Sequence, residues 1–425
     1  MKKTFLLMIV LLALIPCLPH SVPARTWLIP SELTSIQAGI DSSTSGDTVL
    51  VASGIYIENL DFKGKAIAVV GRDPQHTILD GSSGNWSCVQ FISGEPRAAV
   101  LTGFTITGGV GTESAPGEAP AGGGVYIRES EPSIIGNIIE GNSTIGWGGG
   151  IYCENNSWNT KWSPLIQQNV IRNNTAGGNG GGLGARNSVS PVILENEISY
   201  NQVEGGDGGG MWLALTEDGA VISHNSIVHN IANDHGGGIY GGLATNLRPP
   251  LELLVSWNLV AGNYAHADGN TGDSGGGIWL WETNALVQHH TIVSNTGEGQ
   301  NDSNGGGIVL GYPGTPVIEL NIIALNTKGG GIWCGRGVAP IIRTNLAWQN
   351  VGGEGVNDCP DWWQSNGNVI DNPYFCDPAS GDYQVASNSG VMTHPAGPLG
   401  AFPSPGCGPV SIQLSTWGSL KARYR

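Results

Sequence analysis

Apolar residues and glycines return along the middle of this chain at a nearly fixed interval. A glycine triplet followed by an apolar residue occurs eight times, and the first and last copies begin 207 residues apart, at Gly122 and Gly329. The mean period is therefore about 30 residues, which is typical of a stacked repeat protein. The triplets begin at Gly122, Gly148, Gly180, Gly208, Gly236, Gly275, Gly305 and Gly329.

The residues after each triplet alternate in character, which indicates strands rather than helices. In the second copy, Ile151 and Cys153 would point to one face and Tyr152 to the other. Because only the first set is consistently apolar or small across the copies, we predict that this set faces a core. A unit of this length cannot bury that face alone, so neighbouring units must stack on it.

A second phrase follows each triplet, with asparagines at two fixed positions. In Ile193-x-x-Asn196-x-Ile198-x-x-Asn201, each amide could hydrogen-bond to the same amide of the next unit, and asparagine tolerates left-handed turns. We therefore predict two internal amide ladders with a structural role. The first column contains Asn137, Asn169, Asn196, Asn225, Asn258, His290 in place of asparagine, Asn321 and Asn345, and the second runs from Asn142 to Asn350.

Over residues 30–375, these phrases resemble the repeats of known β-helix proteins. They are similar to the right-handed parallel β-helix of the pectin-lyase-like superfamily, and to the G-G-A-I and F-x-x-N repeats of chlamydial polymorphic outer-membrane proteins. The resemblance implies an all-β fold, a right-handed parallel β-helix with an N-terminal cap and an irregular C-terminal cap. It leaves the function open, because this fold hosts lyases, hydrolases, adhesins and structural proteins.

The enzyme signatures of that superfamily are missing from the sequence. Polygalacturonases carry Asp-Asp and G-H-G patches, and neither occurs here. Pectate lyases carry an R-x-P-x-x-R segment, and the nearest approach, Arg248-Pro249-Pro250, lacks the second arginine. These absences favour a non-catalytic protein over an enzyme.

The chain divides into four parts by composition. Residues 1–24 are predicted to be a signal peptide, because two lysines precede an apolar run that is shorter than the roughly 20 residues of a membrane span. We expect an N-terminal cap over residues 25–47, the β-helix over 48–350 and a C-terminal capping region over 351–425. The predicted localisation is secreted or cell-surface, with no transmembrane span.

Six cysteines remain after the predicted signal peptide. Cys153 and Cys334 occupy inward positions far apart in the chain and are predicted to be free, buried thiols. Cys359, Cys376 and Cys407 cluster near the C-terminus of an exported protein, so we expect one disulfide there, between Cys376 and Cys407.

The net charge of the chain limits the classes of molecule that it is expected to bind. The chain has 34 acidic and 18 basic residues and a formal net charge of −16, which argues against nucleic acid and anionic membranes. Only 12% of the residues are charged, so the surface suits neutral sugars, hydrated polymers or divalent cations. The length would allow two or three domains, but the continuous repeat favours one solenoid, expected to be a monomer.

Aromatic residues follow the inward residue in most of the glycine strands. Parallel coils lie about 4.8 Å apart, so these rings should form an outward column that could stack on sugar faces and bind a glycan. The alternative is that neighbouring loops fold over the rings and bury them. The predicted ligand-binding column consists of Tyr126, Tyr152, Trp212, Tyr240, Trp279 and Trp333, interrupted by Gly184 and Val309.

Acidic residues precede successive triplets at one corner. Asp207, Asp234, Asp273 and Asp302 should lie within about 5–10 Å of their neighbours in a stack. They could bind Ca²⁺, or Asp207, Asp234 and Asp273 could serve with His235 as catalytic acid–base groups for glycoside cleavage. The alternative is a solvated acidic edge that keeps a glycine-rich surface soluble.

Two functional hypotheses follow from these features. The first is a secreted or surface β-helix protein that binds polysaccharide or a cell-surface glycan without catalysis, for binding or adhesion. The second is a polysaccharide lyase or glycoside hydrolase that acts on an acidic polysaccharide, with Ca²⁺ as the candidate cofactor.

Overall fold

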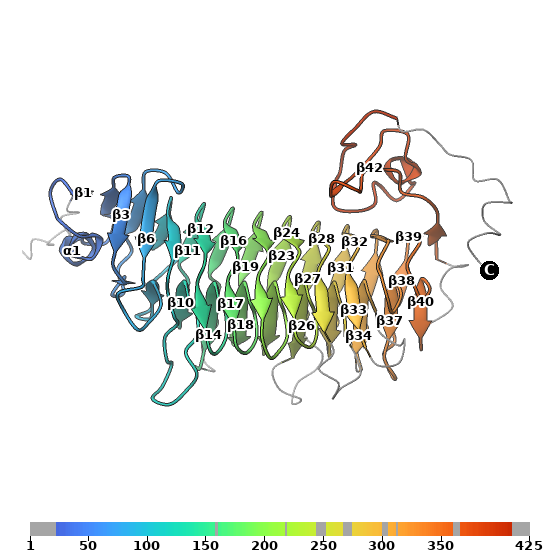
Figure 1. Cartoon of the computed structure of the whole chain (residues 1–425), viewed down its shortest axis with the longest axis horizontal. Coiled ribbons are helices and arrows are strands. Elements are labelled where there is room, and N and C mark those ends of the chain that lie inside the picture. Colours follow the sequence, from blue (N-terminus) through green and yellow to red (C-terminus); the bar gives the residue numbers. More distant parts are fainter. Residues whose placement is uncertain are drawn as a thin grey trace, which may run out of the picture.

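The chain folds into a parallel β-solenoid, as the repeat predicts. The computed structural model describes residues 23–157, 160–216, 219–243, 252–266, 274–299, 305–311, 313–359 and 366–409. Figure 1 shows the strands of successive coils side by side along one long axis. Within the described residues, helix is confined to α1 (Ile36–Ser42) and one 3₁₀ turn (Gly390–Thr393). The all-β, parallel solenoid prediction is therefore confirmed.

Three long parallel sheets run the length of the solenoid, and each complete coil contributes one strand to each. The first sheet contains, in order, β1 (Thr26–Ile29), β2 (Thr48–Val51), β5 (Ala68–Gly71), β8 (Val100–Thr102), β11 (Ser133–Ile135), β15 (Leu165–Gln167), β19 (Val192–Leu194), β23 (Val221–Ser223), β27 (Leu254–Ser256), β31 (Leu286–Gln288), β35 (Val317–Glu319) and β38 (Ile341–Arg343).

The strands after the glycine triplets belong to a second sheet, here called the glycine sheet. It contains β4 (Leu60–Asp61), β7 (Val89–Phe91), β10 (Val125–Arg128), β14 (Ile151–Asn155), β18 (Leu183–Asn187), β22 (Met211–Leu215), β26 (Ile239–Leu243), β30 (Ile278–Trp281), β34 (Ile308–Gly311), β37 (Ile332–Cys334) and β40 (Gly355–Asn357).

The third sheet lies between the two asparagine columns and is here called the asparagine sheet. It contains β3 (Gly54–Ile57), β6 (Thr77–Asp80), β9 (Thr105–Thr107), β12 (Ile138–Glu140), β16 (Val170–Arg172), β20 (Glu197–Ser199), β24 (Ser226–Val228), β28 (Leu259–Ala261), β32 (Thr291–Val293), β36 (Ile322–Ala324), β39 (Leu346–Trp348) and β41 (Val369–Ile370).

Two smaller sheets complete the described structure. A short parallel sheet contains β13 (Ser143–Thr144), β17 (Thr175–Ala176), β21 (Gln202–Val203), β25 (Ile231–Ala232), β29 (Tyr264–His266) and β33 (Thr296–Glu298). Near the C-terminus, β42 (Phe375–Asp377) and β43 (Asp382–Val385) form an antiparallel pair.

One continuous apolar core fills the solenoid. In-register pairing places Ile198 beside Ile227 in the asparagine sheet, and the alternation turns these side chains inward. Ile193, Ile198, Ile227, Ile278 and Ile323 are all fully buried in a single cluster, as predicted.

The glycine triplets are required by backbone geometry. Gly148 has φ of +66°, which L side chains rarely adopt. A Cβ on the next residue, Gly149, would lie 2.5 Å from the carbonyl oxygen of Gly181 in the following coil. The triplets therefore mark a corner where successive coils touch through their backbones.

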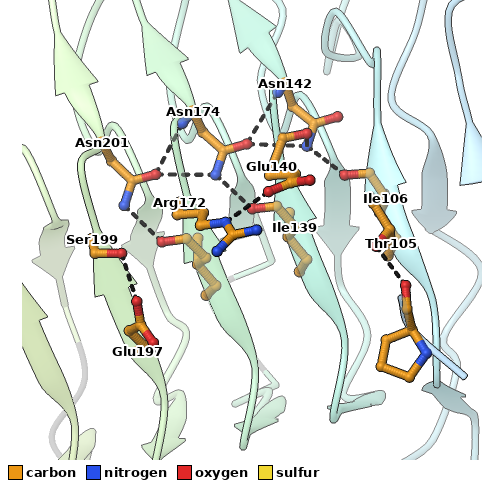
Figure 2. A network of polar contacts seen from close by, with 12 residues as sticks. Thr105, Ile106, Ile139, Glu140, Asn142, Arg172, Asn174, Glu197, Ser199 and Asn201 are labelled. Atoms are coloured by element: carbon orange, nitrogen blue, oxygen red, sulfur yellow. Dashed lines mark hydrogen bonds and ion pairs between the residues drawn. The ribbon is translucent and has the colours of Figure 1, made fainter. Parts of the chain in front are cut away.

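Both asparagine ladders are present, and Figure 2 shows part of the second. Nδ2 of Asn142 donates to Oδ1 of Asn174 at 3.0 Å, and Asn174 donates in the same way to Asn201 at 3.0 Å. Each amide also donates to a backbone carbonyl, as Asn174 does to Ile139 at 2.9 Å. The predicted hydrogen bonds of the ladders are confirmed. The left-handed backbone conformation, however, is adopted by the residue before the asparagine and not by the asparagine itself. Trp257, for example, has φ of +56°.

The chain packs differently before and after the solenoid. At the N-terminal end, the Ser35 hydroxyl accepts a hydrogen bond from the Ala38 N–H and caps α1, whose Ile36 and Ile40 are buried. Near the C-terminal end, the lobe that holds β42 and β43 folds back against the asparagine sheet (Figure 1). In that contact Phe375 and Leu399 belong to the same buried cluster as Val293.

The cysteine predictions are confirmed in part. Cys376 and Cys407 form the expected disulfide. The prediction of a free Cys334 is wrong, because Cys334 is bonded to Cys359, which follows the neighbouring strand β40. Cys88 and Cys153 are the free, buried thiols among the described residues. Two disulfides are consistent with an oxidising compartment outside the cytoplasm.

The predicted signal peptide lies almost entirely outside the described residues, which begin at residue 23. Among the residues that the structure describes, no helix has the length and apolar character needed to cross a bilayer.

Candidate functional site

The predicted aromatic column exists in register, but most of it is not exposed. Tyr126 pairs with Tyr152, and Trp212, Tyr240 and Trp279 pair in succession. Tyr126 and Tyr152 are 0% exposed, Trp279 is 1%, Trp212 and Trp333 are 8%, and Tyr240 is half-buried. The expectation of an exposed outward row is therefore wrong, and the rings are largely buried, as in the alternative interpretation.

The physical reason is that rings in register cover one another. The Tyr126 and Tyr152 rings are nearly parallel, with centroids 6.3 Å apart and planes 4° apart. Their faces therefore turn toward the neighbouring ring rather than toward solvent. The gap at Gly184 is closed as well, since a Cβ there would lie 2.8 Å from Cδ2 of Tyr152. Trp147 stacks on Tyr152 with centroids 6.1 Å apart.

The N-terminal part of the column encloses a buried carboxyl group. The Tyr126 hydroxyl donates a hydrogen bond to Glu154, which is 4% exposed. Burial raises the pKa of Glu154, and the hydrogen bond from Tyr126 and the charge of Arg128 oppose that rise. Burial also raises the pKa of Tyr126, and the nearby carboxylate adds to the effect. This part of the column is a second, polar core.

The C-terminal part of the column is open and forms a pocket of about 370 Å³ on the glycine sheet. Its walls come from β30, β34, β37 and β40 and from the residues that follow β37. The lining residues are Trp279, Trp281, Gly311, Trp333, Gly335, Arg336 and Asn357.

The pocket exists because the aromatic column skips one coil. Val309 of β34 pairs with Trp279 on one side and with Trp333 on the other. Gly311 pairs with Trp281 and has no side chain to cover it. Val309 is itself fully buried against Trp279 and Trp333, so the open space lies over Gly311, between strands that carry large rings.

Sequence reasoning found the interruption at Val309 but missed most of the pocket. Trp281 lies two residues after Trp279, so the strand alternation already placed it on the same outward face. The two rings are nearly parallel, with centroids 6.4 Å apart and planes 14° apart. Arg336 and Asn357 lie at the end of the regular array, where the repeat gives no register to place them.

Some of the acidic residues that precede the glycine triplets lie close together in the structure. Asp207 and His235 lie at the same corner of adjacent coils, because the Gly208 N–H donates to the carbonyl oxygen of His235 at 2.8 Å. Nδ1 of His235 lies 2.7 Å from Oδ1 of Asp207 and 3.4 Å from Oδ1 of Asp234. Asp273 and Asp302 fall outside the described residues.

This cluster supplies part of a cation site. Ligand atoms of Asp207, Asp234 and His235 all lie within 4.8 Å of one another. Calcium prefers about six to eight oxygen ligands, whereas an imidazole nitrogen with carboxylates suits a transition metal such as zinc. The described residues thus give two carboxylates and one imidazole, fewer oxygen ligands than the predicted Ca²⁺ site requires. The His235–Asp207 contact also forms without a metal, and it is an ion pair when the imidazole is protonated.

The acidic corner and the pocket are neighbours, because the ring of Trp279 contacts both. The centroid of the His235 ring lies 4.1 Å from that of Trp279, whose ring lines the pocket. A ligand in the pocket would therefore contact a ring that packs directly on the acid–base cluster.

A second set of stacked rings lies on the asparagine-bearing corner, and sequence reasoning did not single it out. Trp257 stacks between His224 and His289, with centroids 5.9 Å and 3.9 Å away. These residues occupy the left-handed position before each asparagine, which holds their side chains outside the core. The sequence does contain the relevant pattern, because an aromatic ring recurs at this position of three successive repeats. Of these three rings, only Trp257 has a neighbouring ring on both sides among the described residues, and His224 is exposed.

The comparisons with known proteins find only a distant structural likeness. No family model matches the chain, and no curated protein matches it. The chain is similar to the solved structure of the PL6-family alginate lyase AlyGC, and to a variant of that enzyme in which an arginine is replaced by alanine. In both cases the TM-score is 0.34, the identity is 11%, and the match covers 92% of this chain and 60% of the enzyme chain. The chain thus spans well under two thirds of that enzyme's length, and the likeness concerns the β-solenoid fold alone.

Proposed function

We propose that this protein is a secreted or cell-surface β-solenoid that binds a glycan, without cleaving it, through the pocket at the C-terminal end of the aromatic column. The observation that supports this proposal is the pocket itself, which is walled by three indole rings and bordered by Arg336 and Asn357. Carbohydrate and small-molecule sites combine such apolar walls with a few polar groups that fix orientation.

The chemistry of the lining fits a carbohydrate. Indole rings offer flat apolar surface to the C–H faces of a sugar, and they carry an N–H donor for its oxygens. Arg336 contributes a guanidinium and Asn357 an amide, which together donate to and accept from hydroxyl groups. No carboxylate is among the described lining residues, although the whole chain carries a net charge of −16.

The other predicted column residues have a different role in this proposal. Tyr126, Tyr152 and Trp212 are buried and support the glycine sheet. Tyr240 is half-buried, lies between Trp212 and Trp279 in register and packs near His235, outside the pocket lining. Trp279 and Trp333 remain ligand-binding residues through the part of each ring that lines the pocket.

Affinity electrophoresis tests the proposal. The protein is run through native gels that each contain one polysaccharide, and a retarded band reports binding. Trp281→Ala should abolish the retardation, because Trp281 is a partly exposed wall of the pocket. Trp257→Ala is the matched control, since it removes a partly exposed tryptophan from another corner. The proposal fails if no polysaccharide retards the wild-type protein, or if both variants behave like wild type.

The acidic corner supports a second candidate function, cleavage of the bound polysaccharide. The observation in its favour is the contact between His235 and Trp279, which places an Asp–His pair beside the pocket. In a hydrolase or lyase, His235 would transfer a proton and Asp207 would orient its ring. Incubating the retained polysaccharide with the protein, and measuring new reducing ends and unsaturated products, tests this candidate. Activity that is absent from Asp207→Asn would replace the non-catalytic proposal.

We also propose that residues 1–24 direct export. Two disulfides favour an oxidising destination. Expression in a bacterium with a secretory pathway should yield an extracytoplasmic protein whose first residue is Arg25. Retention of the uncleaved chain in the cytoplasm would contradict this proposal.

A further inference from the structure

We propose that the pocket holds one saturated sugar ring between the Trp279–Trp281 wall and Trp333. This inference rests on the proposed function and adds the binding mode and the ligand class. The pyranose ring would lie over Gly311, beside the buried Val309, where the strand has no side chain in register with Trp281.

The register sets the thickness of the slot. Trp279 and Trp333 are separated by one coil, that of Val309. Successive coils lie about 4.8 Å apart, so the two indole-bearing strands are about 9–10 Å apart. Carbon atoms in contact lie about 3.5–4.0 Å apart, so a flat aromatic guest needs only about 7–8 Å between its neighbours. The buried Val309 side chain takes up the inner part of this spacing, so a guest would occupy the outer part, over Gly311.

The floor of the slot lacks side chains at the positions that matter. Gly311 is the register partner of Trp281, and a Cβ on it would lie 3.2 Å from Cε3 of Trp281 and 3.4 Å from Cζ2 of Trp279. A Cβ on Gly335 would lie 3.2 Å from Cζ3 of Trp333. The two glycines thus lie directly beneath the indole rings. Any larger side chain at either position would enter the space that we assign to the ligand.

Two unpartnered donors indicate what the guest must provide. Trp279 and Trp333 are 1% and 8% exposed, and the buried Nε1–H of each has no hydrogen-bond partner among the residues that the structure describes. Both rings line the pocket. A sugar ring has hydroxyl and ring oxygens around its rim that could accept from these N–H groups, whereas a hydrocarbon guest could not.

Neither interruption of the column is itself an opening. At Gly184, the ring of Tyr152 extends into the space above the glycine. At the other interruption Val309 is buried, and the pocket opens two residues further along that strand, over Gly311. Trp279 and Trp281, which are held side by side on β30, line this opening.

The test is calorimetric titration with defined probes. The probes are the methyl pyranosides of glucose, galactose, mannose and xylose, oligosaccharides of two to four units cut from the polysaccharide that retards the protein most, and p-nitrophenol as a flat ring. Wild-type protein should bind at least one sugar probe. Gly311→Leu, which fills the slot, should weaken that binding at least tenfold. Because its side chain also crowds the rings of Trp279 and Trp281, a melting curve with a single cooperative transition must show that the variant is folded.

Two further variants separate the binding mode from the function. Trp333→Phe keeps a ring but removes the N–H donor, and should weaken binding severalfold. Trp257→Ala should bind like wild type.

The other possible results show which part of the proposal is wrong. If Trp281→Ala loses binding but Gly311→Leu keeps it, the glycan crosses the mouth of the pocket, so the sandwich is wrong and the proposed function stands. If Trp333→Phe binds like wild type, the donor role of Trp333 is wrong. If p-nitrophenol binds and no sugar does, the ligand class is wrong. If no sugar probe binds and no polysaccharide retards the protein, the proposed function and this inference fall together.

Discussion

The backbone N–H of Asn258 donates a hydrogen bond to Nδ1 of His290 at 3.1 Å. In neighbouring coils the same acceptor is an asparagine Oδ1, as when the Asn225 N–H donates to Asn258 at 2.8 Å. The histidine therefore imitates an amide oxygen inside the ladder. Nδ1 accepts in this way only in the tautomer that carries its proton on Nε2. The full burial of the ring disfavours the charged form, so the folded protein favours a neutral ring at this position.

This preference makes stability depend on pH. Burial lowers the pKa of His290 from 6.5 to about 4, and the backbone carbonyls of Val255 and Asn258 only partly oppose that shift. Between these two values the unfolded chain binds a proton that the folded chain does not. Stability is therefore full above pH 6.5 and falls as the pH drops toward 4, by about 3 kcal/mol in total.

His290→Asn should remove this contribution and restore the regular ladder. Urea unfolding at pH 7 and at pH 4.5 measures it in both proteins, and the wild type should lose about 2–3 kcal/mol more than the variant between these pH values. Equal losses in the two proteins would show that His290 is not the group responsible.

Glu154 should give a pH dependence of the opposite sign. Burial raises its pKa in the folded state, so the folded chain binds the proton more readily than the unfolded chain. The stability tied to this group is present below the unfolded value and is lost as the pH rises through the folded pKa.

Glu154→Gln keeps an oxygen that can accept from the Tyr126 hydroxyl and cannot ionise. The variant should be more stable than wild type at pH 7, and the difference should vanish near pH 4. Thermal melts over this range are the measurement. A variant that is less stable at pH 7 would mean that the carboxylate charge itself stabilises the fold, through the two nearby arginines, Arg128 and Arg186.

The buried rings predict which aromatic substitutions unfold the protein. Trp279 is 1% exposed, so Trp279→Ala should destabilise by about 3–5 kcal/mol. Trp257→Ala removes a partly exposed ring outside the core and should cost much less. Chemical denaturation compares the two variants. Equal stabilities would contradict the assignment of Trp279 to the core, and the contrast explains why Trp281 is the better residue for binding studies.

The acidic corner makes a separate prediction about cations. Any ion that binds only the folded protein raises the melting temperature by mass action. Because the described donors include an imidazole, Zn²⁺ should raise it at lower concentration than Ca²⁺. The double variant Asp207→Asn, Asp234→Asn should lose the response to both ions. A wild-type melting temperature that neither ion changes would leave these residues as an ion pair at a solvated edge.

The fold was predictable because its signals are local and repeated. The Ile193 and Asn196 positions recur in each unit, and stacking gives every copy the same neighbours, so inward burial and the amide ladders follow from one copy. Because successive side chains of a strand point to opposite faces of the sheet, the sequence also placed Tyr152 outside the core of the solenoid. It could not show that Tyr126 and Trp147 would cover that ring, because covering depends on neighbouring coils and loops.

The candidate site was predictable only where it follows the repeat. Asp207 and His235 precede successive triplets, so their convergence was readable from spacing. Arg336 and Asn357 contribute to the pocket from the end of the array, where the pattern stops. Cys334 was misassigned for the same reason, since its partner Cys359 lies in the irregular region.

The central claim is that a glycan binds between the tryptophans of the C-terminal pocket. Its most direct test is a tryptophan fluorescence titration with oligosaccharides of the retained polysaccharide. The account predicts a saturable change in emission for wild-type protein and for Trp257→Ala, and none for Trp281→Ala or Gly311→Leu. Superimposable titrations of the wild type and Trp281→Ala would contradict it.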